Sequence, residues 1–157
     1  MDCFLKEGVC MGNSTNSIEG LLEEGKVLRI KPEGYSMYPM FVPGRDEAVI
    51  KGIKAGSARR GDVVLYRRKN GILVLHRLHH RGKDGLYMLG DNQVKTEGPL
   101  KEGQVTGVLT GFIRNGKYIS TNNILYKILS GIWLFMRPVR RPFQLAAAWI
   151  KKKWYGG

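Results

Sequence analysis

The sequence is poor in cysteine, which limits what can hold its fold together. Its only two cysteines among 157 residues are Cys3 and Cys10, too few for a disulfide-held fold. Neither has the spacing partners of a zinc site, and the residues around them leave a bond between the two open. We therefore expect a fold stabilised by an apolar core, with no metal and no cofactor.

Acidic residues are missing from the last third of the chain. After Glu102 there is no Asp or Glu, whereas residues 1–25 carry a net charge of −4, from five acidic residues and one lysine. The basic residues of the last third are Arg114, Lys117, Lys127, Arg137, Arg140, Arg141, Lys151, Lys152 and Lys153. Such a segment attracts anionic partners, namely lipid head groups, nucleic acid or an acidic protein surface.

Long apolar runs are also missing. The uncharged runs 128–136 and 142–150 are far shorter than the roughly 20 residues that a membrane-spanning helix needs. The first residues lack the charged and apolar regions of a secretory signal. We therefore expect no N-terminal transmembrane segment, and a protein that is cytoplasmic or peripherally associated with a membrane.

What is abundant is glycine, with 21 residues, together with short apolar stretches separated by turns. This pattern predicts a mainly β fold, a small coiled sheet or barrel, preceded by a short helix at 17–24. Asn70-Gly71 and Asn115-Gly116 are hairpin turn signals. The predicted strands are 26–31, 45–51, 63–66, 72–78, 86–89 and 104–113.

The last third changes from strand to helix patterns. Apolar residues recur at helical spacing from Ile124 to Met136, and a second helical piece is predicted from Phe143 to Trp154. These pieces form a helical hairpin packed on the β domain, a basic amphipathic anchor at a membrane interface, or a nucleic-acid-binding tail. We divide the chain into an N-terminal segment (1–25), a β domain (26–121) and a basic helical tail (122–157).

Ser36 lies in the loop Gly34-Tyr35-Ser36-Met37-Tyr38-Pro39, between two predicted strands. A serine in such a loop often only bonds its own backbone. It becomes a nucleophile when a base reaches its hydroxyl and a third group orients the base. Of the three histidines, His76 lies within an apolar strand, whereas His79 and His80 fall at the strand end, where we expect them to be solvated.

Four blocks of the sequence, in this order, resemble the type I signal peptidase family, which is related to the LexA-like serine peptidases. They are the Ser36 loop, Gly61-Asp62-Val63-Val64, Leu75-His76-Arg77-Leu78 and Gly90-Asp91-Asn92. A histidine before Arg77 matches the histidine-base form of the endoplasmic reticulum and archaea. The resemblance covers about residues 26–113. It implies that Ser36 is the nucleophile, His76 the general base and Asp91 the carboxylate that orients His76.

The resemblance also implies how a substrate is held. The backbone N–H of Ser36 would serve an oxyanion hole, with Met37 and Pro39 as further oxyanion or substrate contacts. The family usually has a second aspartate a few residues after the Gly-Asp-Asn block. Here Glu97, six positions past Asp91, is the nearest candidate, and we assign it a possible auxiliary role.

These observations predict a serine endopeptidase that resembles signal peptidase I. Its substrate is a leader or signal-like peptide, or a partner protein, with small residues at the scissile bond as the family implies. Self-cleavage near Cys10-Met11-Gly12 is a variant of this prediction. The alternative is a non-catalytic module that binds membrane or nucleic acid through the basic helices. We expect peripheral contact with an anionic membrane and do not expect nucleic acid as a partner.

Overall fold

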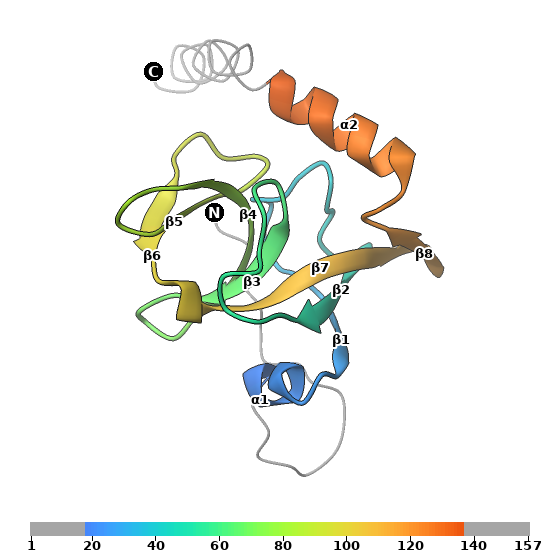
Figure 1. Cartoon of the computed structure of the whole chain (residues 1–157). Coiled ribbons are helices and arrows are strands. Elements are labelled where there is room, and N and C mark those ends of the chain that lie inside the picture. Colours follow the sequence, from blue (N-terminus) through green and yellow to red (C-terminus); the bar gives the residue numbers. More distant parts are fainter. Residues whose placement is uncertain (1–17, 137–157) are drawn as a thin grey trace, which may run out of the picture. The chain divides into compact units, whose positions relative to one another are not determined.

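The structure is a computed structural model and describes residues 18–136 (Figure 1). Helix α1 (Ile18–Glu23) opens it, helix α2 (Ile124–Phe135) closes it, and a 3-10 helix (Glu102–Gln104) precedes the longest strand. The strands are β1 (Val27–Ile30), β2 (Asp46–Gly52), β3 (Val63–Arg67), β4 (Leu73–Arg81), β5 (Leu86–Leu89), β6 (Glu97–Leu100), β7 (Val105–Arg114) and β8 (Lys117–Ser120). Cys3, Cys10 and the predicted helical piece 143–154 lie outside the described residues.

The strands form one antiparallel sheet. Its order is β1-β2-β7-β3-β4-β5-β6, and β8 pairs with β7 beside this path. In Figure 1, β7 is the long strand that crosses the sheet, and it pairs with both β2 and β3. The predicted mainly β class is confirmed. The sheet does not close on itself, because β1 and β6 stand at the two ends of the path.

Strands β3 and β4 form the buried centre of the sheet. Residues 63–66 and 74–78 are buried without interruption, as in strands covered on both faces. Val64, Tyr66, Val74 and Leu78 belong to one apolar cluster. His76 lies in the same stretch with no exposed surface. Buried polar atoms of this kind need hydrogen-bond partners, so the environment of the His76 ring is informative.

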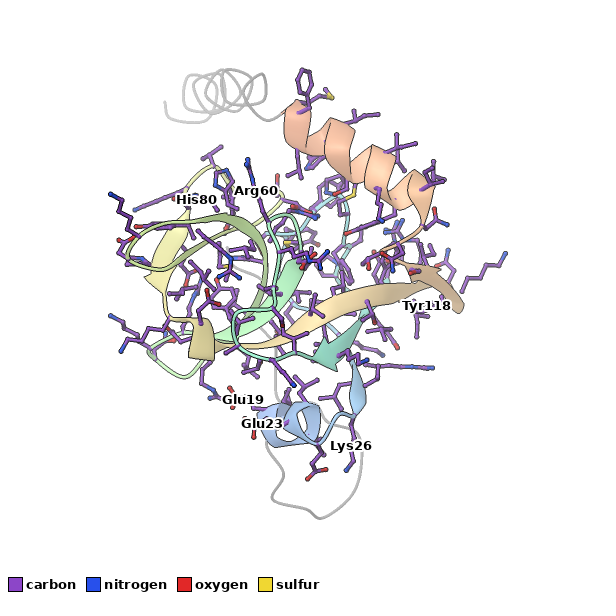
Figure 2. All side chains as sticks on the ribbon, viewed as in Figure 1. Glu19, Glu23, Lys26, Arg60, His80 and Tyr118 are labelled. Atoms are coloured by element: carbon purple, nitrogen blue, oxygen red, sulfur yellow. The ribbon has the colours of Figure 1, made fainter. Side chains whose placement is uncertain are left out.

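Helix α1 is the short helix predicted at 17–24, and it packs against the sheet. Leu22 is 2% exposed, and a side chain at Gly52 of β2 would overlap the backbone of Leu22. Glu19, which is labelled in Figure 2, forms an ion pair with Arg67 of β3. The helix therefore packs on β1, β2 and β7 and leaves the Ser36 loop to other contacts.

Strands β6 and β8 were not among the strands predicted from the sequence. Strand β8 follows the predicted Asn115-Gly116 turn, where both residues have the positive φ that such a hairpin requires. Strand β6 contains Gly98-Pro99, which argues against a strand except at a sheet edge, where β6 indeed lies. It pairs with β5 through two register positions, Leu86 with Leu100 and Met88 with Glu97. This edge strand brings the half-buried Glu97 next to Tyr66 of the buried centre.

Helix α2 belongs to a compact unit of its own, because the unit that contains the sheet ends at Asn123. It matches the helix predicted from the apolar spacing after Ile124. Among the residues that the structure describes, none of the helices has the length and apolar character needed to cross a bilayer.

Candidate active site

The Ser36 loop, between β1 and β2, is held by the turn that follows β5. The N–H of Asn92 donates to the Ser36 carbonyl at 2.7 Å, and Nδ2 of Asn92 donates to the Tyr35 carbonyl at 3.3 Å. Gly90 permits this approach, because a Cβ there would lie 2.7 Å from the Ser36 carbonyl oxygen. Two of the four sequence blocks are thus joined through backbone contacts, and they fix where Ser36 lies.

The side chain of Ser36 meets His76 of β4. Its Oγ lies 3.1 Å from Nε2 of His76, although the two residues are 40 positions apart. Ser36 is 2% exposed and His76 is fully buried. The distance lies within the 2.6–3.2 Å in which a base can take a hydroxyl proton. The predicted nucleophile and base are therefore brought together.

The hydroxyl of Tyr66, on β3, contacts Nδ1, the other nitrogen of the His76 ring. It lies 3.0 Å from Nδ1 and donates to Oε2 of Glu97 at 2.8 Å. A phenol has one proton to give, so a tyrosine that donates to Glu97 must accept from Nδ1–H. The neutral imidazole then carries its proton on Nδ1, and Nε2 presents its lone pair to the hydroxyl of Ser36.

Glu97 is in turn held by Arg68. Nε and Nη2 of Arg68 donate to the two carboxylate oxygens at 2.6 and 2.5 Å. Burial alone would raise the pKa of Glu97, but the hydrogen bonds from Arg68 and Tyr66 outweigh it, and the pKa is lowered. Burial and the hydrogen bond to Glu97 both raise the pKa of Tyr66. At neutral pH the pair is therefore an ionised carboxylate and a neutral phenol.

Asp91, predicted to orient His76, forms an ion pair with Arg77. Nε and Nη2 of Arg77 donate to its carboxylate oxygens at 2.8 and 2.7 Å, and Nη1 donates to the Gly61 carbonyl at 2.7 Å. His76 and Arg77 are neighbours on a strand, so their side chains point to opposite sides. Both carboxylate oxygens of Asp91 face the Arg77 guanidinium. Nδ1 of His76 contacts the hydroxyl of Tyr66, which in turn bonds Glu97.

The predicted substrate contacts around Ser36 divide by exposure. Met37 is 1% exposed, so its side chain packs in the core, and the predicted oxyanion or substrate contact is left to its backbone. Pro39 is partly exposed. Tyr35 and Tyr38 are 55% and 44% exposed, and their rings lie 6.5 Å apart. These two aromatic residues are the side chains of the loop that face solvent.

The two remaining histidines are not part of this arrangement. His79 and His80 are partly exposed on β4, with their Nδ1 atoms 2.8 Å apart, and His80 stacks on Tyr87. Within residues 18–136, no group of three or more His, Cys, Asp or Glu side chains is placed to hold a metal ion.

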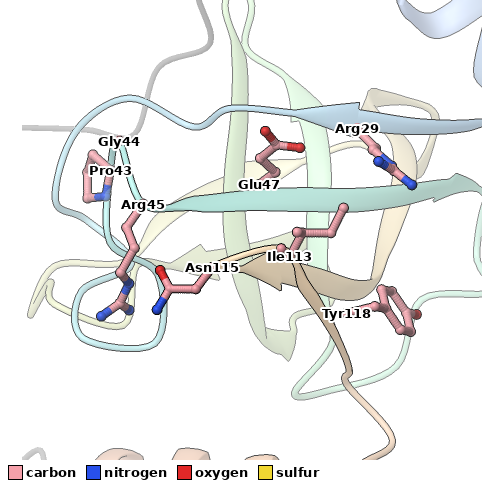
Figure 3. Close-up of a pocket in the computed structure, with 9 residues that line it drawn as sticks. Arg29, Pro43, Gly44, Arg45, Glu47, Ile113, Asn115 and Tyr118 are labelled. Carbon is pink, nitrogen blue, oxygen red and sulfur yellow. The ribbon is translucent and has the colours of Figure 1, made fainter.

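Two surface recesses differ in their relation to Ser36. One, of about 520 Å³, is lined by Arg68 and residues 92–97, so it shares Asn92 and Glu97 with the site. The other, of about 740 Å³, lies between the 43–45 loop and strands β1, β2, β7 and β8 (Figure 3). Its Arg45 and Glu47 already pair with Asp46 and Lys31. The first recess is therefore the one to consider for a substrate.

Tyr66 and Arg68 were not predicted as site residues, although one signal in the sequence points to Tyr66. Because β3 and β4 form the predicted Asn70-Gly71 hairpin, Tyr66 stands opposite Val74 and His76 opposite Val64. Tyr66 and His76 are then diagonal neighbours, a spacing that lets long side chains meet.

Comparison of the chain with protein-family models, with curated proteins and with solved structures found no match.

Proposed function

We propose that the chain is a serine endopeptidase with Ser36 as nucleophile and His76 as general base. One observation carries the proposal: Nε2 of His76 lies 3.1 Å from Oγ of Ser36 while Nδ1 contacts Tyr66. These two contacts fix both the orientation of the His76 ring and its tautomer. A serine that only closes a turn has no need of a buried histidine held in this way, whereas an activated hydroxyl requires it.

The order of the four sequence blocks supports the same proposal. They resemble the histidine-base form of the type I signal peptidases, and we propose that the open coiled sheet is a fold of the signal peptidase and LexA-like type. The antiparallel topology and the approach of Gly90-Asp91-Asn92 to the Ser36 loop agree with this assignment. The replacement of a second aspartate by Glu97 is then a variation within the site.

The proposed reaction begins when Oγ of Ser36 attacks the scissile carbonyl and its proton passes to Nε2 of His76. The backbone N–H of Ser36 is the proposed donor to the oxyanion. His76 then protonates the leaving amine, the C–N bond breaks and an acyl-serine remains. A water molecule, deprotonated by His76, hydrolyses the ester and restores Ser36. Ionised Glu97, acting through Tyr66, stabilises the imidazolium that forms in both steps.

The proposed substrate is a leader-like peptide or an exposed segment of a partner protein. Ser36 is only 2% exposed, which favours an extended segment with small side chains at the scissile bond. The recess of about 520 Å³ next to Asn92 and Glu97 offers room for a neighbouring substrate side chain. An extended peptide can also hydrogen-bond along a strand edge, a common way of holding protease substrates.

The test measures cleavage of a library of leader peptides with small residues at varied positions, read by mass spectrometry. Ser36→Ala and His76→Ala should each lower kcat/KM by at least about a thousandfold. The matched controls are Ser57→Ala, an exposed serine that bonds Lys54, and His80→Ala on the same strand as His76. Both controls should cleave like the wild type. Cleavage that survives Ser36→Ala would refute the proposal, and so would a wild type that cleaves no peptide with or without lipid.

A further inference from the structure

Helix α2 exposes more large apolar side chains than any other element in the described part of the chain. Seven side chains of α2 and the residue after it are 45–86% exposed. They are Ile124, Leu125, Ile128, Leu129, Ile132, Phe135 and Met136. The N–H of Met136 still bonds the Ile132 carbonyl, so helical geometry extends to that residue. We call these seven residues the apolar strip.

The apolar strip is continuous on one side of the helix. At 3.6 residues per turn its members fall within an arc of about 140°. The less exposed side chains lie outside this arc, namely Tyr126, Ser130, Trp133 and Leu134. Scattered apolar residues need no explanation, but a continuous exposed strip marks a surface that contacts something apolar.

We infer that the apolar strip binds the surface of an anionic lipid membrane. Lys127 is the only charged side chain of α2, and the chain after Glu102 has nine Lys and Arg with no acidic residue. An apolar strip flanked by charges of positive sign only is the composition of helices that lie in the membrane interface. An acidic-free segment of this kind also repels a second copy of itself, which makes self-association the weaker interpretation.

The length of the helix decides how it binds. Twelve residues at 1.5 Å per residue give about 18 Å, well short of a hydrocarbon core of about 30 Å. Helix α2 therefore lies along the surface with its strip among the acyl chains and Lys127 near the head groups. The surface belongs to α2 and uses none of the residues of the Ser36 site, so the inference stands independently of the proposed peptidase.

The experiment measures co-sedimentation of the full chain with vesicles of phosphatidylcholine alone and of phosphatidylcholine with phosphatidylglycerol. Two matched variants each add one positive charge to α2. Ile128→Lys removes an apolar side chain from the strip, whereas Gly131→Lys replaces an exposed glycine beside which a Cβ meets nothing within 4 Å. Circular dichroism checks that both variants keep the fold of the wild type.

We expect the wild type and Gly131→Lys to bind the phosphatidylglycerol vesicles and to bind phosphatidylcholine vesicles far more weakly. Ile128→Lys should lower the partition coefficient by about tenfold or more, because it gives up the burial of one isoleucine. Ser36→Ala should bind like the wild type, which separates this inference from the peptidase proposal. Equal binding by the two lysine variants would refute insertion of the strip. A wild type that ignores vesicles but forms a dimer sensitive to Ile128→Lys would assign the strip to a second copy.

Discussion

Two arginine–carboxylate pairs are linked by neighbouring contacts to Ser36 and His76, and they differ in what they hold. Arg77 and Asp91 are buried, with side chains 9% and 0% exposed, and they tie the Gly61 turn to the turn that carries Asn92. Arg68 and Glu97 are 17% and 29% exposed, and they reach His76 through Tyr66. The first pair therefore holds backbone, and the second holds a ring.

The difference teaches that two ion pairs of similar chemistry can hold different parts of one site. The Asp91 turn fixes the carbonyl of Ser36 through Asn92, so the Arg77–Asp91 pair controls where Ser36 lies. The contact of Glu97 with Tyr66 sets the protonated nitrogen of His76, so the Arg68–Glu97 pair controls which ring nitrogen can accept a proton. Breaking each pair should therefore affect different measurements.

The largest effect should come from Asp91→Asn. The substitution removes the charge that balances the buried Arg77 guanidinium, which costs about 3–5 kcal/mol in the free energy of unfolding. Urea denaturation followed by far-ultraviolet circular dichroism measures this loss. The matched control is Asp84→Asn, an exposed aspartate that accepts from Tyr87, where a change within about 0.5 kcal/mol is expected. Equal unfolding free energies for the two variants would contradict the structural role of Asp91.

Tyr66→Phe should come next, and it should affect catalysis more than stability. Without the hydroxyl, Nδ1 of His76 loses its acceptor and the ring no longer has a preferred tautomer. We expect kcat/KM to fall about a hundredfold, with kcat rather than KM carrying the change. The nitrogen chemical shifts of His76 report the tautomer directly, a signal that a purely structural tyrosine would not alter.

The control for Tyr66→Phe is Tyr87→Phe. This variant also removes a hydroxyl that donates to a carboxylate, but the acceptor is Asp84 and not Glu97. It should leave kcat/KM and the nitrogen shifts of His76 unchanged. If Tyr66→Phe behaves like this control, the histidine is oriented by another group, and the assignment of Tyr66 as a positioning residue fails.

The same contrast explains what the sequence could and could not predict. The Ser36 and His76 pairing was predictable, because both residues lie in recognisable blocks and β4 is a continuous apolar run. Strands β1 to β5 and β7 follow from apolar spacing and turn residues. The ion pair of Asp91 with Arg77 was not predicted, since its block reads the same whether the carboxylate faces His76 or Arg77. Only the folded chain shows the contact with Arg77.

The role of Glu97 could not be predicted in physical detail. It depends on β6 pairing with β5 at the edge of the sheet. This strand is not predicted from residue propensities, because it contains Gly98-Pro99. The role of Glu97 depends also on Tyr66 standing between Glu97 and His76, a diagonal contact that appears only once the β3–β4 register is known. Two strand pairings, β3 with β4 and β5 with β6, must therefore be correct before the link between Glu97 and the His76 ring can be predicted.

The smallest effect is expected from Glu97→Gln, and its signature is a change in pH dependence. The pKa of Glu97 is lowered in the folded chain, so its ionised form stabilises the fold above the ordinary value of 4.5. That contribution is lost as the pH falls from there through the lowered folded value. Urea denaturation at a series of acidic pH values should show a steeper loss of unfolding free energy for the wild type than for Glu97→Gln.

The difference in unfolding free energy between the wild type and Glu97→Gln is more informative than either pH curve alone, because Asp46 titrates in the same pH range. Its burial opposes ionisation, but hydrogen bonds from Arg45 and Arg114 lower its pKa to about 2. Since Asp46 is present in both proteins, its contribution cancels in the difference. At neutral pH, Glu97→Gln should lower kcat/KM by about tenfold, less than Tyr66→Phe, because a glutamine still accepts from Tyr66 but no longer stabilises the imidazolium by charge. Parallel acid curves together with unchanged activity would mean that the Arg68–Glu97 pair is only a surface ion pair.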